Sequence, residues 1–588
     1  MVKSRLKLLL ALVLLGCISA IILSALVGSG RLIGYFGSGA DPASALKLVP
    51  AVPLDLKERV NWLPDFPSAK EGRALDPYTR DQIAGAYLRA WAQWDISYEL
   101  QQPYGLKTYF ARPAFDLVSS AVTSTVSAGW RIRQSSIQHT LQLAFYAGDG
   151  LLVAFTDQNA YLVQQVGQSK ATKNPLPDLI QESNHVYDVV MQLEDGNWRV
   201  RDLVRRGAGP LMEHSQAKRA PATGFVQTQG RHLLLDDKLY TVAGVNYYPQ
   251  AAPWAKFWSE YQTTQTKADL ALIRQLGLNT VRIFIPYADF GGDKVDPLML
   301  KKLQDFLDQA QAQHLKVIVT LFDHQTDHNL NAWAGDDRHL AGLIPQFAAH
   351  PAILAWDLKN EPNLDYGSNT QTLTDAWLRH IAHTVRRYDA NHLLTIGWST
   401  PEAAAALTDV VDLVAFHYVE PSATYGARLT TLLKAAPEKP VLLEEFVMSS
   451  WNSYWPNGHS EQEQALYYAD LLRQHRIYAT AGYMVWTLHD FDMTPLTQYL
   501  LPTKRAEANM GLVRRDGALK PAAAIIKPGA SLDLAPLPRG YRFTKPFWRL
   551  VLGGSVMGVG FVFGVWWWRR RRVMSPSGKG RTAPSINE

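Results

Sequence analysis

The chain has 588 residues, of which 47% are hydrophobic and 19% charged, so it is long enough for several domains and too apolar to be disordered throughout. Its formal net charge of +6 is concentrated at the two ends: residues 1–7 and 569–588 carry more than the whole excess, which leaves about −2 between them. A strongly basic surface for nucleic acid is therefore excluded, and the single cysteine, Cys17, excludes an intrachain disulfide framework.

Residues 6–28 form an apolar run near the start of the chain. A helix of this length reaches across a hydrocarbon core of about 30 Å, so we expect a transmembrane helix here. A cleaved signal peptide and a lipoprotein with Cys17 as its lipidated residue are the alternatives. We favour an uncleaved anchor, because residues 18–27 stay apolar where a lipoprotein normally turns polar.

Residues 29–76 contain Gly, Pro and Ser without a sustained hydrophobic period, which predicts a linker. Residues 77–206 begin with a helical pattern over 79–99 and continue with alternating segments that predict an antiparallel sheet. An Asp195-Gly196 turn joins the last two strands. This pattern predicts an α+β domain that resembles nuclear-transport-factor-2-like cone domains, which serve as spacers or dimer modules as well as binding pockets. We expect a spacer.

Residues 224–530 alternate between apolar runs and helical segments, for example the helical segments at 298–314, 372–388 and 461–475. This rhythm predicts an α/β fold, specifically a (β/α)8 TIM barrel. Active sites of such barrels lie at the C-terminal ends of the strands, so polar residues at those ends are candidates for chemistry. The eight predicted strands lie at 240–246, 280–285, 316–322, 353–358, 393–398, 412–417, 441–446 and 482–488.

Acidic residues follow two of these strands. The fourth strand leads into Asn360-Glu361-Pro362, and the seventh ends in Glu444-Glu445-Phe446. With these motifs at those positions, residues 225–527 resemble the retaining glycoside hydrolases, and within them the cellulase and mannanase type, glycoside hydrolase family 5.

This resemblance implies a mechanism with two carboxyl groups about 5 Å apart, one an acid/base and the other a nucleophile. Glu361 would be the acid/base and Glu445 the nucleophile. Glu444 is the alternative nucleophile, because strand alternation points the two neighbours in opposite directions and their parity cannot choose between them. The family's Glu-Phe pattern favours Glu445.

The resemblance also implies further binding residues at the same end of the barrel. Asn360 would bind the sugar 2-hydroxyl, and Arg282 would orient the nucleophile and keep it ionised. Hydrogen bonds to substrate or carboxylate are implied for His324 and His417, and stacking against a sugar ring for Trp486.

One position departs from the family pattern. The family commonly shows His-x-Tyr at strand six, with the tyrosine touching the nucleophile, whereas this chain reads His417-Tyr418-Val419. Either Tyr418 reaches the site through a local bulge, or another tyrosine, Tyr247 or Tyr248, takes its place. The segment 323–339 is rich in Asp and His, but we expect neither a metal nor a cofactor, because the glutamate pair supplies a complete mechanism.

Residues 550–568 form a second apolar run, which ends in three tryptophans and is followed by four arginines. Tryptophans suit a membrane interface and arginines its cytoplasmic side, so we expect a second transmembrane helix and a basic cytoplasmic tail over 569–588. Both termini would then be cytoplasmic in a two-pass protein of the inner membrane, and the body would be extracytoplasmic. Small residues at four-residue spacing in both runs would allow helix packing within the chain or in a homodimer.

These features predict a membrane-anchored retaining β-glycosidase that hydrolyses or transglycosylates a β-linked poly- or oligosaccharide, such as an exopolysaccharide. Expected partners are the saccharide, the lipid bilayer and either a second copy or a polysaccharide-synthesis complex. The alternative function is a non-catalytic saccharide-binding or scaffold subunit of a polysaccharide export complex. The presence of both glutamates favours the enzyme.

Overall fold

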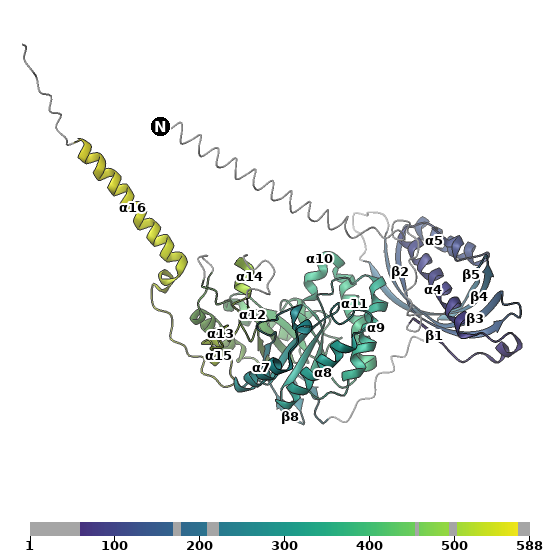
Figure 1. Ribbon diagram of the computed structural model, residues 1–588, viewed down its shortest axis with the longest axis horizontal. Helices are drawn as coiled ribbons and strands as arrows, with labels where there is room; N and C mark the ends of the chain where they lie inside the picture. Colours follow the sequence, from purple (N-terminus) through teal and green to yellow (C-terminus); the bar gives the residue numbers. More distant parts are fainter. Residues whose placement is uncertain (1–58, 169–177, 209–222, 453–457, 493–501, 574–588) are drawn as a thin grey trace, which may run out of the picture. The chain divides into compact units, whose positions relative to one another are not determined.

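The structure is a computed structural model that describes residues 59–168, 178–208, 223–452, 458–492 and 502–573 (Figure 1). The chain divides into two compact units, residues 1–213 and 214–588. The predicted span over 6–28, with Cys17, lies outside the described residues, as do residues 29–58 of the predicted linker and 574–588 of the predicted tail.

The first unit has two helices followed by a curved sheet, the order expected for residues 77–206. Helices α4 (Pro77–Glu99) and α5 (Ala114–Ser127) precede the long antiparallel strands β2 (Trp130–Tyr146), β3 (Leu152–Gln168), β4 (Leu179–Glu194) and β5 (Asn197–Ala208). The helices pack against the sheet around a core that includes Tyr87, Trp91 and Met191 (Figure 1). The likeness of this unit to cone domains stays a prediction.

The linker predicted over residues 29–76 includes residues that belong to this unit. Strand β1 (Val60–Trp62) pairs in parallel with β2, and a 3-10 helix, η1, covers Pro67–Glu71. Val60 and Leu75 are buried in the core, and Trp62 packs against Phe155. These contacts depend on residues distant in sequence, so the local absence of periodicity did not reveal them.

Helices begin where the sequence supplies a cap for their free amide groups. The Asp76 side chain accepts a hydrogen bond from the Thr79 amide, at 3.0 Å, at the start of α4. In the second unit, Ser460 and Glu463 form a reciprocal capping box at the start of α13 (Glu461–His475). Asp and Ser side chains hydrogen-bond to nearby backbone amides, which disfavours them inside helices and here places them at helix starts.

The second unit contains a closed barrel of eight parallel strands, which confirms the predicted (β/α)8 architecture. A three-stranded antiparallel sheet of β6 (Val226–Gln229), β7 (His232–Leu235) and β8 (Lys238–Tyr240) precedes it. The barrel strands are β9 (Val242–Asn246), β10 (Thr280–Pro286), β11 (Lys316–Asp323), β12 (Ile353–Asn360), β13 (Leu393–Trp398), β14 (Val414–Tyr418), β15 (Val441–Phe446) and β16 (Gly482–Val485).

Helices surround this barrel. The predicted helical segments appear as α8 (Pro297–Ala312), α11 (Gln371–Tyr388) and α13. The other helices are α6 (Lys256–Ser259), α7 (Thr263–Gln275), α9 (Leu330–Phe347), α10 (Tyr366–Asn369), α12 (Tyr425–Ala435), α14 (Pro502–Glu507) and α15 (Ala522–Ile525), with 3-10 turns η2 (Leu106–Thr108) in the first unit and η3 (Pro362–Asp365), η4 (Ala403–Ala405), η5 (Ser422–Thr424) and η6 (Tyr541–Thr544) in the second.

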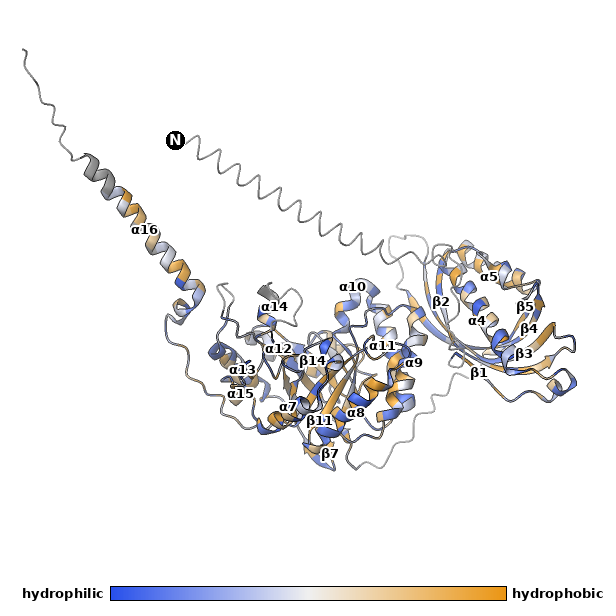
Figure 2. Ribbon diagram, in the orientation of Figure 1, coloured by the Kyte–Doolittle hydropathy of each residue, from blue (hydrophilic) through white to orange (hydrophobic). Residues whose placement is uncertain are grey.

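Both faces of the barrel strands are covered, one by the barrel interior and one by the helices. Every residue of β9, β10, β13 and β14 is buried. Figure 2 shows hydrophobic colour along strands such as β11 and a mixture of colours on the surrounding helices. Polar residues inside these strands are therefore exceptions, and several of them, including Arg282, Asp357 and Glu444, belong to the cluster described in the next subsection.

The last described helix, α16 (Pro546–Val573), contains the second predicted span, residues 550–568. Gly553, Gly554 and Ser555 interrupt its apolar residues, and several of its side chains lie outside the description. Among the residues that the structure does describe, no helix is both long and apolar enough to cross a membrane. This finding bears on the second predicted span, whereas the first lies outside the described residues.

Candidate active site

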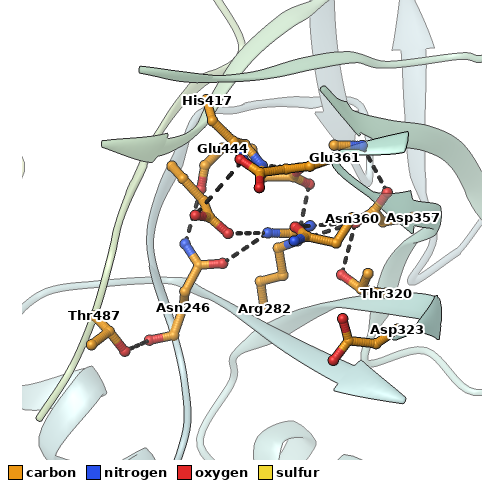
Figure 3. Close-up of polar contacts among 12 residues, drawn as sticks. Asn246, Arg282, Thr320, Asp323, Asp357, Asn360, Glu361, His417, Glu444 and Thr487 are labelled. Carbon is orange, nitrogen blue, oxygen red and sulfur yellow. Dashed lines mark hydrogen bonds and ion pairs between the residues drawn. The ribbon is translucent and has the colours of Figure 1, made fainter. Parts of the chain in front are cut away.

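Arg282 lies in the middle of β10 and is the centre of a buried polar cluster (Figure 3). Its Nη1 donates to Glu445 Oε1 at 2.5 Å and to Asn246 Oδ1 at 3.2 Å. Its Nη2 donates to Asp357 Oδ2 at 2.6 Å and to Asn360 Oδ1 at 2.9 Å. A buried guanidinium is tolerated only when its donors are paired, and here four residues on the three strands β9, β12 and β15 supply the acceptors.

The two predicted catalytic glutamates lie beside one histidine. His417 Nδ1 is 2.9 Å from Glu361 Oε1 and 3.8 Å from Glu445 Oε2. Because both oxygens are this close to one atom, they lie less than about 7 Å apart, within reach of the separation of about 5 Å that retaining glycosidases use. The structure therefore brings Glu361, Glu445 and His417 together as the resemblance implied.

Glu361 is held at the end of β12 by an unusual backbone conformation. Its φ of 49° lies in the left-handed region, and its amide donates to the Gly397 carbonyl at 2.7 Å. Non-glycine residues in this region are uncommon and cluster at functional sites. This turn lifts the Glu361 side chain out of the strand and leaves it 30% exposed.

Exposure separates the two candidate nucleophiles. The Glu445 side chain is 13% exposed, whereas Glu444 is fully buried. A nucleophile has to reach the anomeric carbon of a bound sugar, so this difference favours Glu445 over Glu444.

A β-bulge explains why both glutamates approach the same cluster. In the pairing of β14 with β15, Phe416 lies opposite Leu443 but His417 lies opposite Glu445, so Glu444 is an extra residue. Alternation along β15 is interrupted at this point. The expectation that the two neighbours point in opposite directions does not hold, because Glu444 and Glu445 both lie within 4 Å of Arg282 and of His417.

The charges of the cluster shift its pKa values strongly. Burial raises the pKa of Glu445 to about 7, although His417 and Arg282 both act to lower it. Burial also acts to raise the pKa of Glu361, but the hydrogen bond and charge of His417, with the charges of Arg282 and Lys359, together outweigh it and leave that pKa below its usual value. For His417, burial acts to lower the pKa, but Glu445, Glu361 and Glu444 together raise it to about 10. The direction of this shift favours the imidazolium form of His417 in the unliganded site.

Asp357 is a member of the cluster that sequence reasoning missed. It is fully buried on β12, where Thr320 Oγ1 donates to it at 2.7 Å and the Gly397 amide at 2.9 Å, in addition to Arg282. Burial and the neighbouring Glu444 raise its pKa to about 6 against the effect of Arg282. The sequence did contain a signal for it: Asp357 is an acidic residue inside an apolar strand, three positions before Asn360, and a buried charge needs a partner.

Trp486 and His324 have different surroundings. Trp486 follows β16 and is partly exposed, with edge contacts to Tyr248 and Phe284 at ring-centroid distances of 6.1 and 5.8 Å. Phe284 lies under the Arg282 guanidinium, 4.6 Å from its centre, so Trp486 borders the cluster. His324 is 64% exposed and its ring faces Asp323 at 3.5 Å. His324 makes no contact with the two predicted catalytic glutamates, Glu361 and Glu445, in the described part of the chain.

Tyr418 points away from the site. Its hydroxyl contacts the Pro421 carbonyl and Thr424 Oγ1, each at 2.8 Å, on the outer side of the barrel. The structure therefore does not bring Tyr418, the predicted substrate-binding residue, to the cluster, because the extra residue of the bulge belongs to β15 and not to β14.

Of the two alternative tyrosines, Tyr248 is the one that faces the cluster. Its hydroxyl donates to Asp323 Oδ2 at 3.4 Å, and burial together with the charges of Asp323 and Glu445 raises its pKa well above the usual value. Tyr247 instead donates to Asp269 at 2.8 Å.

The barrel matches a known protein family. Residues 240–491 match the family model described as Cellulase (glycosyl hydrolase family 5), and this match includes all eight barrel strands. The result supports a glycosyl hydrolase family 5 domain in this chain.

Curated relatives are similar over the same part of the chain. The mannan endo-1,4-beta-mannosidase A of Podospora anserina is 24% identical over 216 residues, which cover 31% of this chain and 56% of that protein. The mannan endo-1,4-beta-mannosidase 1 of Arabidopsis thaliana is 26% identical over 213 residues, covering 30% and 51%. The chain thus spans about half the length of these curated relatives.

A solved structure, that of GH5_18 from Streptomyces cattleya in complex with GlcNAc, aligns with 49% of this chain and 79% of its own, at 20% identity and a TM-score of 0.41.

Proposed function

We propose that this protein is a retaining β-glycosidase that hydrolyses O-glycosyl bonds by double displacement. The observation that carries the proposal is that Glu361 and Glu445, at the C-terminal ends of two barrel strands, both lie within 4 Å of His417 Nδ1. The family match over residues 240–491 and the names of the curated relatives support it.

In the first step, Glu445 attacks the anomeric carbon while Glu361 protonates the departing glycosidic oxygen. Arg282 holds Glu445 in position through its Nη1 and favours the ionised form that attack requires. In the second step, Glu361 accepts a proton from water, and the resulting hydroxide equivalent releases the sugar from Glu445.

Binding of the sugar at the reacting centre would involve Asn360 and Trp486. Arg282 occupies the amide oxygen of Asn360, which leaves the amide nitrogen as the donor for a sugar hydroxyl. Trp486 offers a partly exposed aromatic face beside the cluster, and aromatic rings commonly stack on the apolar faces of sugars.

We propose a β-linked oligo- or polysaccharide as the substrate, with β-mannosides first because the curated relatives are named as mannan β-mannosidases. An exopolysaccharide made by the same cell fits the proposed location of the enzyme. Transglycosylation to another sugar follows the same first step, with a sugar hydroxyl in place of water.

We propose that the protein is tethered to the inner membrane with its barrel outside the cytoplasm. Support comes from the apolar runs at 6–28 and 550–568 and from the arginines at 569–572. Protease added to intact spheroplasts should then cleave the barrel, whereas a tag on the C-terminus should stay protected. Protection of both would contradict this topology.

The function is tested by incubating the purified protein with β-mannans, β-glucans and aryl β-glycosides and measuring reducing ends and product stereochemistry. Release of the β-anomer, abolished in Glu445→Gln, is expected of a retaining hydrolase. Saccharide binding by a folded protein without any turnover would contradict the enzyme proposal and support the alternative of a saccharide-binding scaffold.

A further inference from the structure

Glu444 is a buried carboxylate that the proposed mechanism does not use. It is fully buried, and its oxygens Oε1 and Oε2 accept no hydrogen bond from the described residues. Its contacts are charged: Oε1 lies 3.5 Å from Arg282 Nε, and Oε2 lies 3.5 Å from His417 Nε2. A carboxylate in such a place is costly unless nearby positive charge compensates it.

Arg282 alone does not provide that compensation. Its guanidinium is already shared with Asp357 and Glu445, which accept its hydrogen bonds at 2.6 and 2.5 Å. Three carboxylates thus surround one arginine. The second positive charge that the cluster needs comes from His417, which is buried and faces Glu444 directly.

His417 connects Glu444 with the acid/base. Its Nδ1 lies 2.9 Å from Glu361 Oε1 and its Nε2 lies 3.5 Å from Glu444 Oε2 (Figure 3). An imidazolium has one N–H on each nitrogen, so both of its protons point at carboxylates here. A neutral imidazole with its proton on Nε2 would still face Glu444 with a donor.

We propose that Glu444 is a positioning residue that keeps His417 protonated, so that His417 stores the proton which Glu361 delivers to the leaving group. The inference rests on the proposed glycosidase function. The proposal gives a role to Glu444, the extra residue of the β15 bulge. Without such a role, the bulge would only add a buried carboxylate to a cluster that already holds two.

The proton balance of this relay is simple. Before cleavage, the Nδ1–H bond of His417 breaks and an O–H bond forms on Glu361, which leaves a neutral imidazole whose Nε2–H faces Glu444 Oε2. Glu361 then gives this proton to the glycosidic oxygen as the C–O bond breaks. In the second step Glu361 takes a proton from water and returns it to His417 Nδ1, so no proton is gained or lost over the cycle.

The directions of the pKa shifts agree with this scheme. The pKa of His417 is raised to about 10, with Glu445, Glu361 and Glu444 as the groups that raise it against burial and Arg282. The pKa of Glu361 is lowered, chiefly by His417 against the effect of burial, so Glu361 does not hold the proton at rest.

The first test compares Glu444→Gln with Glu444→Asp in the full-length protein. Glutamine removes the charge and preserves size, whereas aspartate preserves the charge. With phenyl β-mannoside, which needs a proton for departure, we expect the alkaline limb of the kcat/KM profile of Glu444→Gln to move down by about 1–2 pH units. With 2,4-dinitrophenyl β-mannoside, whose leaving group needs no proton, the alkaline limb should stay where it is in the wild type.

Glu444→Asp keeps the charge but places it farther from His417, so the alkaline limb for phenyl β-mannoside should move down by less than in Glu444→Gln, and the limb for 2,4-dinitrophenyl β-mannoside should not move. An equal loss of rate at every pH for both substrates, with no movement of the alkaline limb, would indicate a purely structural role and overturn the inference. If Glu444→Gln fails to fold, a displaced alkaline limb in Glu444→Asp would support the inference and an unmoved one would overturn it, because the shorter side chain lengthens the contact with His417.

A second measurement does not depend on turnover. Histidine labelled with ¹³C in the ring reports its protonation by NMR, and the His417 signal is identified by its absence in His417→Asn. We expect His417 to be charged at pH 8 in the wild type and to titrate at lower pH in Glu444→Gln. If this shift occurs in a protein that cleaves none of the glycosides, the glycosidase proposal fails and the coupling of Glu444 to His417 stands. If glycosides are cleaved and the titration does not move, the relay fails alone.

Discussion

His417 on β14 lies directly opposite Glu445 on β15, because the bulge in β15 adds Glu444 to that strand. This register puts Glu445 within 4 Å of both His417 and Arg282 while leaving it partly exposed. The same register buries Glu444 beneath it. One inserted residue thus determines which of two adjacent glutamates can meet a substrate.

Azide should restore activity after the loss of a carboxylate at only one of these two positions, Glu445. We expect Glu445→Ala to lose turnover of 2,4-dinitrophenyl β-mannoside and to regain it with azide, because a small anion can occupy the vacated space and attack the sugar. The product of that single displacement is the α-glycosyl azide, the inverted anomer. Glu444→Ala is the matched control, and formation of the α-azide by Glu444→Ala instead would show that the nucleophile was misassigned.

Removal of the acid/base should depend on the leaving group. We expect Glu361→Gln to lower kcat/KM for phenyl β-mannoside by about 10²–10⁴-fold, the usual contribution of a positioned acid. The loss for 2,4-dinitrophenyl β-mannoside should be much smaller, because that leaving group departs without a proton. Glu438→Gln, at an exposed position, is the control for a general effect of losing a carboxylate. Equal losses for both substrates would argue against an acid role for Glu361.

Much of this site was predictable because barrel strands carry their own signals. Apolar runs with polar residues at their ends predicted eight strands, and the Asn360-Glu361 and Glu444-Glu445 pairs occur at two of those ends. Position along a strand is a local property, so the sequence reveals it directly.

The contacts that were not predictable depend on register between strands. The bulge that brings Glu444 inward lies in β15, whereas β14 has no extra residue at this point and Tyr418 faces outward; no local pattern specifies which of the two paired strands carries the bulge. The pairing of β1 with β2 is of the same kind, since residues 60–62 meet residues 139–141. Long-range partners of this sort appear only once the fold is known.

Gly397 is required because the cluster leaves no room for a side chain. A Cβ atom there would lie 2.6 Å from Glu444 Oε2 and 2.7 Å from Arg282 Nη2. We expect Gly397→Ala to displace these groups, lower the free energy of unfolding by about 1–3 kcal/mol and reduce kcat at least tenfold. Gly367→Ala is the control, since a Cβ at Gly367 meets nothing within 4 Å. Thermal unfolding and kcat of both variants check this, and wild-type values for Gly397→Ala would contradict it.

Substitution of Tyr418 and of Tyr248 by phenylalanine should have different effects, the first on stability and the second on kcat. Tyr418→Phe removes hydrogen bonds to Pro421 and Thr424, so we expect a loss of about 1 kcal/mol in stability and an unchanged kcat. Tyr248→Phe removes a hydroxyl that lies between Asp323 and the cluster, so we expect a several-fold lower kcat. Urea unfolding and kinetics of both variants measure the contrast, and a lower kcat in Tyr418→Phe alone would restore the original assignment of that residue.

Activity should fall on the acidic side as Glu445 becomes protonated. The pKa of Glu445 is raised to about 7 by burial, and only its ionised form attacks the anomeric carbon. Because kcat/KM reports groups of the free enzyme, we expect it to fall about tenfold per pH unit below pH 7. The same limb should appear with 2,4-dinitrophenyl β-mannoside, since every substrate needs the nucleophile. Thermal unfolding at each pH separates this loss from acid denaturation, and a kcat/KM that stays level from pH 7 to pH 5 would mean that Arg282 and His417 overcome burial at Glu445.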